Sequence, residues 1–232
     1  ALGYDLWDVV VNDPNEELNQ THVTQPALLT ASVAIYRALQ DVAPFTPSIM
    51  AGHSLGEYSA LVCSGVLSLE DGVKLVKARG EFMQAAVKPG AGAMYAIIGL
   101  DDVAIIAACA QAQTDSGEVV AAVNFNSPGQ VVIAGTAKAA EIAATACKAA
   151  GAKRALPLAV SVPSHCALMD PAAESLGQLL ATVTFNEPTV PFINNVDVAI
   201  EQDASAIKNA LVRQLSCPVQ WTKTVESFAQ HG

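Results

Sequence analysis

The chain has 232 residues, of which 52% are hydrophobic and 15% charged, and 12 Lys and Arg against 22 Asp and Glu give a net charge of −10. This apolar content excludes an intrinsically disordered chain. The negative charge argues against a nucleic-acid-binding protein, which would carry a basic face. Asn, Pro, Gln and Gly interrupt the long uncharged stretches, so we expect no membrane-spanning helix. The length allows one large domain or a domain with an insertion.

The first third of the chain combines helices with one short strand. Helical periodicity runs through residues 26–42, with Thr24 as the expected N-cap. The apolar run 47–52 predicts a strand, which a helix beginning at Leu55 follows directly. A second long helix is expected over residues 69–87, where Lys-Pro-Gly then stops it.

In the next segment, short strands alternate with helices. Strands are expected at 94–100, 119–124, 130–134 and 154–160, and helices at 101–113 and 136–150. This β-α-β-β-α-β order is the ferredoxin-like pattern. We therefore interpret residues 90–162 as a small inserted subdomain.

After Cys166, helices and strands alternate again. We expect helices at 172–182, 204–215 and 219–229, and a strand at 190–194. Together with the first third, this alternation predicts a mostly parallel α/β layer fold. The predicted fold class is therefore α/β, with residues 1–89 and 163–232 as the main domain.

Residues 52–56, Gly-His-Ser-Leu-Gly, match the G-x-S-x-G pattern between an expected strand and an expected helix. In this context Ser54 would occupy a sharp, strained turn, and glycine on both sides would avoid Cβ clashes. The hydroxyl would lie at a helix N-terminus, where the Leu55 N–H can stabilise an oxyanion. The alternative interpretation is a fortuitous glycine-rich turn.

A serine nucleophile needs a base, and the chain has four histidines: His22, His53, His165 and His231. His165 lies in a loop after an expected strand, the kind of position from which a base reaches an elbow serine. His53 is expected to point away from Ser54. A loop histidine on its own is more often solvated, but paired with Ser54 we interpret His165 as the base.

An ordinary hydrolase would place an acidic residue between the serine and the histidine in sequence. The candidates Asp101, Asp102 and Asp115 all fall within the predicted inserted subdomain. The sequence therefore predicts a Ser54–His165 pair without a triad acid.

Arg79 lies in the helix that follows the elbow, in a chain with few basic residues. A guanidinium binds a carboxylate through two parallel hydrogen bonds, so Arg79 suits a substrate with a free carboxylate. The alternative is a surface ion pair with Glu81 or Glu57.

Five scattered cysteines lack the spacing of a zinc site or a disulfide framework. They are typical of reduced thiols, so we expect no metal and a cytoplasmic protein.

Several separated motifs resemble one family, the malonyl-CoA:acyl-carrier-protein transacylases of bacterial type II fatty acid synthesis. They lie at residues 24–29, 52–61, 79–80, 124–130, 162–165 and 194–197, in the order of the family, and span nearly the whole chain. The four motifs at 52–61, 79–80, 124–130 and 162–165 are together far more specific than G-x-S-x-G alone.

The resemblance implies an α/β-hydrolase-like core with a ferredoxin-like insertion. It also implies that Ser54 is the nucleophile and His165 the base, with the imidazole oriented by the main-chain carbonyl of Gln214. The Leu55 N–H would belong to the oxyanion hole, and the remaining substrate-binding residues would be Arg79, Gln25 and Asn126.

The family also opens with a strand ending in Gly-Gln-Gly-x-Gln and continues beyond the last residues of this sequence. Neither part is present here. We therefore expect a chain that is truncated at both ends.

The expected reaction moves a malonyl group from malonyl-CoA to the phosphopantetheine thiol of acyl carrier protein by a ping-pong mechanism, without a cofactor. Alternatives are a serine esterase or thioesterase, an acyltransferase domain of a polyketide synthase, and a non-catalytic carrier-binding module. The expected partners of this monomer are a coenzyme A thioester and acyl carrier protein. Lys148, Lys153 and Arg154 are candidate docking residues for the acidic carrier, although they could equally form a solvated helix end.

Overall fold

Four strands between residues 92 and 157 form one antiparallel sheet in the computed structural model of the chain, which describes residues 1–160 and 162–230. The sheet and its helices comprise β1 (Gly92–Ile98), α5 (Asp102–Ser116), β2 (Val120–Ser127), β3 (Gln130–Thr136), α6 (Ala137–Ala149) and β4 (Arg154–Pro157). The strand order is β2-β3-β1-β4, and every neighbouring pair is antiparallel.

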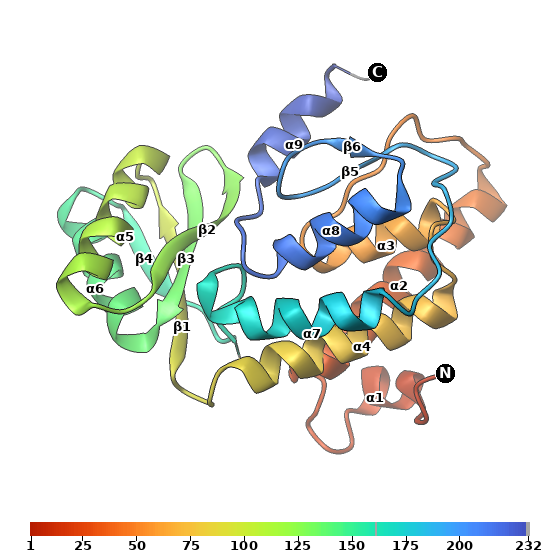
Figure 1. Cartoon of the computed structure of the whole chain (residues 1–232), viewed down its shortest axis with the longest axis horizontal. Coiled ribbons are helices and arrows are strands. Elements are labelled where there is room, and N and C mark those ends of the chain that lie inside the picture. Colours follow the sequence, from red (N-terminus) through yellow and green to blue (C-terminus); the bar gives the residue numbers. More distant parts are fainter. Residues whose placement is uncertain (161, 231–232) are drawn as a thin grey trace.

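The observed element order in this segment is the predicted β-α-β-β-α-β order. α5 and α6 pack against each other and bury an apolar layer with the strands (Figure 1). All six elements lie within the segment 90–162, whose status as a separate subdomain stays a prediction.

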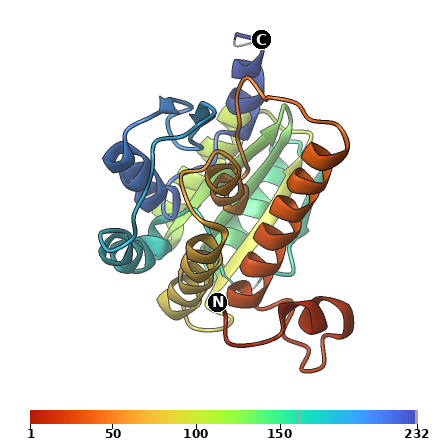
Figure 2. The same ribbon diagram turned by 90° about the vertical axis from the view of Figure 1, so that its right-hand side faces the viewer.

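The rest of the chain is largely helical. Its elements are α1 (Leu6–Asn12), α2 (Thr21–Val42), α3 (Leu55–Cys63), α4 (Leu69–Ala86), the short 3-10 helix η1 (Ala167–Met169), α7 (Asp170–Leu180), α8 (Ala204–Gln214) and α9 (Trp221–Phe228). Figures 1 and 2 show α1, which the sequence did not predict, beside one end of α2.

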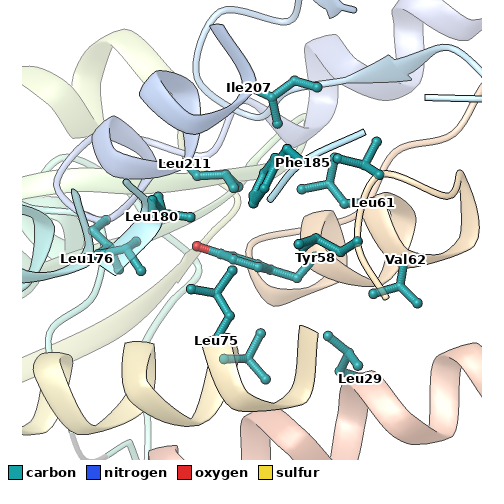
Figure 3. Close-up of a cluster of buried hydrophobic side chains, with 14 of the residues drawn as sticks. Leu29, Tyr58, Leu61, Val62, Leu75, Leu176, Leu180, Phe185, Ile207 and Leu211 are labelled. Atoms are coloured by element: carbon teal, nitrogen blue, oxygen red, sulfur yellow. The ribbon is translucent and has the colours of Figure 1, made fainter. Parts of the chain in front are cut away.

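The core of this part lies among α2, α3, α4, α7 and α8. The side chains of Leu29, Leu61, Leu75, Leu176 and Leu211 converge there, each from a different helix (Figure 3). Such residues recur every three or four positions along their helices, so each helix turns one apolar stripe inward. The amphipathic pattern is why these helices could be predicted from the sequence.

The mostly parallel sheet predicted for this part is not confirmed among the described residues. β5 (Phe192–Ile193) pairs in antiparallel fashion with β6 (Ile200–Glu201), and Met50 forms only an isolated parallel bridge to Phe192. A proline cannot donate to a strand ladder, and Pro47 and Pro191 flank this short pairing. The α/β class stands, whereas the hydrolase-like parallel arrangement does not follow from these elements.

The predicted start of α2 was wrong. The N-cap is Gln20, and the helix begins at Thr21, so that Pro26 lies inside it. The hydroxyl of Thr24 does not cap the helix; it donates to the carbonyls of Leu18 and Gln20.

Among the described helices, none is both long enough and apolar enough to cross a membrane.

Close packing of α2 against α4 depends on Gly80. A Cβ atom at this position would lie 2.5 Å from the Cα of His22 and 2.7 Å from its nitrogen, both of which are backbone atoms. We expect Gly80→Ala to lower the free energy of unfolding by about 1–3 kcal/mol, because the two helices must separate. Chemical denaturation measures this change.

Gly177 in α7 is the matched control. Its Cβ would lie 3.5 Å from the side chain of Val212, an ordinary contact. Since alanine favours a helix interior over glycine by up to about 1 kcal/mol, Gly177→Ala should preserve or raise stability. Equal destabilisation by both substitutions would contradict this account of α2–α4 packing.

Candidate active site

Ser54 occupies the turn that leads into α3, with φ 51° and ψ −106°. This is a region that side-chain-bearing residues rarely adopt, and strain of this kind persists only where the surroundings impose it. The turn holds the Ser54 hydroxyl at the N-terminus of α3. Leu55 is the first residue of that helix, and its N–H belongs to the donors that a helix leaves without an internal partner.

Only one of the two glycines in the motif is required by steric contact. A Cβ on Gly52 would lie 1.9 Å from the carbonyl carbon of Gly56 and 2.0 Å from its oxygen. A Cβ on Gly56 would meet nothing within 4 Å. The prediction that both glycines prevent clashes is therefore right for Gly52 and wrong for Gly56.

His165 reaches Ser54 from the loop after β4. Its Nε2 lies 2.8 Å from the Ser54 Oγ, and its Nδ1 lies 2.6 Å from the main-chain oxygen of Gln214. Because a carbonyl only accepts hydrogen bonds, Nδ1 must carry the proton and Nε2 is free to accept the hydroxyl proton of Ser54. The His165 backbone N–H also donates to the Leu215 oxygen at 2.9 Å, which ties the loop to the end of α8.

Burial keeps this imidazole neutral. His165 is 3% exposed. Desolvation, followed by the positive charge of Arg79, lowers the pKa of His165 to about 3, although the hydrogen bond to Gln214 opposes this shift. The ring is therefore in the form that can take a proton from Ser54 at neutral pH.

Arg79 is buried beside the serine, not on the surface. It is 2% exposed. Its Nη1 donates to Gln25 Oε1 at 2.7 Å, while its Nη2 donates to Ser54 Oγ at 3.2 Å and to Gln214 Oε1 at 3.0 Å. The predicted alternative, an ion pair with Glu81 or Glu57, is absent from the salt bridges of the described residues.

Glu57 acts on Arg79 only through space, and the hydrogen-bond partners of Arg79 are all neutral. A buried cation without a direct anionic partner is costly unless an anion reaches it. A cavity of about 320 Å³ opens at this point, lined by Gln25, Ser54, Leu55 and Arg79 together with residues of the loop before His165. The cavity therefore brings an activated hydroxyl and a buried positive charge to one ligand.

Asn126, predicted to bind substrate, is placed differently. Its Oδ1 lies 2.8 Å from the Nε2 of His53, whose ring also meets Trp221 edge-on at 5.5 Å. Asn126 does not line the cavity described above. The prediction that His53 faces away from the Ser54 hydroxyl agrees with these contacts.

The three basic residues predicted to meet a carrier protein lie together at the end of α6 and the start of β4. Lys148, Lys153 and Arg154 are all exposed, and the Lys148 Nζ donates to the Lys153 oxygen at 3.4 Å. They lie close together in sequence, and their role in docking stays a prediction.

Three polar contacts of the site were not predicted from the sequence. The Ser54 N–H donates to Asn195 Oδ1 at 2.7 Å, and the Gln214 Nε2 donates to the Ser54 oxygen at 3.0 Å and to Glu57 Oε2 at 2.8 Å. Glu57 and Asn195 lie in motifs noted above, but spacing alone says nothing about contacts across 140 to 160 residues. Within the described part of the chain, no group of three or more His, Cys, Asp or Glu is arranged to hold a metal.

Comparisons with known proteins identify the family of the chain. A profile described as an acyl transferase domain matches residues 1–232. Malonyl CoA-acyl carrier protein transacylase of Escherichia coli (strain K12) is 64% identical over 232 residues, which are all of this chain and 74% of that protein. The Bacillus subtilis (strain 168) protein of the same name is 45% identical over 232 residues, again the whole of this chain, and 73% of its own length is covered.

Solved structures give the same result. An acyl carrier protein S-malonyltransferase from Vibrio cholerae has a TM-score of 0.95 at 61% identity, with 100% of this chain and 75% of that chain covered. A malonyl-transacylase in complex with a type II PKS acyl-carrier protein has a TM-score of 0.96 at 61% identity, with 99% and 74% covered. The chain therefore belongs to the acyl transferase domain family.

Proposed function

We propose that the chain transfers a malonyl group from malonyl-CoA to the phosphopantetheine thiol of acyl carrier protein, in fatty acid biosynthesis. The observation that carries the proposal is Arg79, a buried cation without a carboxylate partner, 3.2 Å from the Ser54 hydroxyl. A malonyl thioester has one free carboxylate and one reactive carbonyl, so it fits both groups at once. The malonyltransferase relatives support the same substrates.

In the first half-reaction, His165 Nε2 takes the proton of Ser54 Oγ, which bonds to the thioester carbonyl carbon. The Leu55 N–H stabilises the resulting oxyanion. The C–S bond then breaks, and the thiolate of coenzyme A leaves with the proton from His165. A malonyl ester remains on Ser54, with its carboxylate on Arg79 and Gln25 beside it.

The second half-reaction reverses these steps with another thiol. The phosphopantetheine thiol gives its proton to His165 and attacks the ester carbonyl. Ser54 leaves and recovers the proton. Both half-reactions of this ping-pong mechanism therefore use Ser54 as the nucleophile or leaving group and His165 as the base or acid.

Lys148, Lys153 and Arg154 are the proposed docking patch for the acidic carrier protein. The patch offers positive charge on a chain whose net charge is −10. A structural relative in complex with an acyl-carrier protein supports a carrier partner in general. We place the reaction in the cytoplasm, where malonyl-CoA and reduced thiols would coexist.

Loading of malonyl on Ser54 is the direct test of the function. The chain incubated with malonyl-CoA should gain the mass of one malonyl group by intact-protein mass spectrometry and lose it when carrier protein is added. Ser54→Ala should gain none, because the ester has no oxygen to form on. Ser175→Ala, a change outside the cavity, should load normally; a covalent adduct on Ser54→Ala would rule out the assignment.

Arg79 should determine the preference for malonyl over uncharged acyl groups. We expect Arg79→Ala to lower kcat/KM for malonyl-CoA by about 10²-fold, because a charge-assisted pair is lost, and to affect acetyl-CoA much less. Lys74→Ala is the matched control on α4, since Lys74 only pairs with exposed Glu70. A general esterase, by contrast, would show no change in its preference between the two thioesters.

The rate of malonyl loading should not follow an ordinary histidine titration. The pKa of His165 is lowered to about 3, so the imidazole stays neutral and the single-turnover rate should be level as pH falls from 8 through the ordinary value of about 6.5. The unfolded chain protonates this histidine near 6.5, so stability should decline as pH falls below that value.

Glu57 titrates in the same range, since burial raises its pKa to about 7. The profile is therefore measured on Glu57→Gln as well, with circular dichroism reporting the folded fraction at each pH. An inflection near 6.5 that persists in Glu57→Gln would contradict the neutral, buried imidazole.

A further inference from the structure

Glu57 is a fully buried carboxylate that the reaction itself does not use. It lies in the first turn of α3 with no exposed surface. One of its oxygens, Oε2, accepts two hydrogen bonds, from the Asn195 N–H at 3.1 Å and from the Gln214 Nε2 at 2.8 Å. The other oxygen is buried without a partner among the described residues. Burying a carboxyl group with one oxygen unpaired costs free energy, so a functional reason for its presence is expected.

Asn195 and Gln214, the two donors to Glu57, also form hydrogen bonds with the backbone N–H and carbonyl of Ser54. Asn195 accepts from the Ser54 N–H at 2.7 Å, and its Nδ2 donates to the Gly52 oxygen at 2.8 Å. Gln214 donates to the Ser54 oxygen at 3.0 Å. The side chains of Asn195 and Gln214 therefore fix the strained Ser54 turn on both sides. The Asn195 backbone N–H and the Gln214 amide in turn donate to one oxygen of Glu57.

The orientation of the Gln214 amide follows from its three hydrogen-bond partners. Both of its hydrogens are used, one on the Ser54 oxygen and one on Glu57 Oε2, while its Oε1 accepts from Arg79. A flipped amide would point oxygen at two acceptors and nitrogen at a cation, so only one orientation is allowed. The main-chain oxygen of Gln214 also binds the Nδ1 of His165. Glu57 therefore influences the position of the base through Gln214 as well.

We propose that Glu57 is a positioning residue, which holds the Ser54 turn and the Gln214 amide in their reactive arrangement by accepting hydrogen bonds from Asn195 and Gln214. The proposal rests on the proposed function for the role of Ser54 and His165. It adds a residue that touches neither substrate nor reacting atoms and acts only through its two donors. The role depends on the Oε2 atom as a hydrogen-bond acceptor, and the length of the glutamate side chain brings that atom within reach of both donors.

Two substitutions separate the acceptor oxygen from the negative charge. Glu57→Gln keeps an oxygen at the same distance, able to accept both bonds, and removes the charge. Glu57→Asp keeps the charge and withdraws the oxygen by one methylene group. The probe is a fluorophosphonate, which reacts with an activated serine and needs neither malonyl-CoA nor carrier protein; its second-order rate constant is measured for each variant, together with single-turnover malonyl loading.

We expect Glu57→Gln to label within a few-fold of the unchanged chain and Glu57→Asp to label about 100-fold more slowly, since small displacements of reacting groups have effects of that size. Rescue by the isosteric amide distinguishes positioning from a general effect on folding. Equal rates in all three proteins, equal losses in both variants, or a loss confined to Glu57→Gln would each overturn the proposal.

Asn195→Ala provides a second test should Glu57→Asp fail to fold. It removes the acceptor for the Ser54 N–H and leaves Glu57 in place, and the same slow labelling is expected; a folded Asn195→Ala variant that labels at the original rate would overturn the proposal. Failure of the proposed function has a different signature. Malonyl loading would then be absent from every protein, while fluorophosphonate labelling would still depend on residue 57.

Discussion

The strained backbone of Ser54 is the constraint on which the rest of the site depends. A residue with φ 51° and ψ −106° costs about 1–3 kcal/mol relative to relaxed backbone, and the surrounding structure must impose it. Gly52 permits the turn by leaving room for the Gly56 carbonyl. Asn195 and Gln214 then hold its N–H and its carbonyl. The serine is thus held from the C-terminal part of the chain, far away in sequence.

Arg79 introduces a second constraint, a buried positive charge beside the serine. Neutral oxygens of Gln25, Ser54 and Gln214 surround it, and the ring of Tyr58 lies 5.4 Å away. Burial and this cation together keep His165 neutral, so one charge serves both to bind a carboxylate and to keep the base deprotonated. A substrate carboxylate on Arg79 would cancel part of that field and raise the pKa of His165 as the proton transfer begins. Binding the correct acyl group would in this way strengthen the base.

The sequence predicted well whatever depends on local pattern. Amphipathic periodicity located α4 and α6 almost to the residue, and turn chemistry located the strands of the antiparallel sheet. It failed where distant contacts decide, as in the parallel pairing of Met50, which stays a single bridge. For the site, motifs indicated the Ser54–His165 pair, but nothing local could reveal that Gln214 has a side-chain role besides its carbonyl.

The base owes its position to α8 more than to the sheet from which its loop emerges. His165 has φ 65°, another conformation that must be imposed, and both its backbone N–H and its Nδ1 bind carbonyls at the end of α8, from Leu215 and Gln214. Ser54 is held by Gln214 as well. One helix end therefore holds nucleophile and base alike, and the distance between the reacting atoms follows from the way α8 ends.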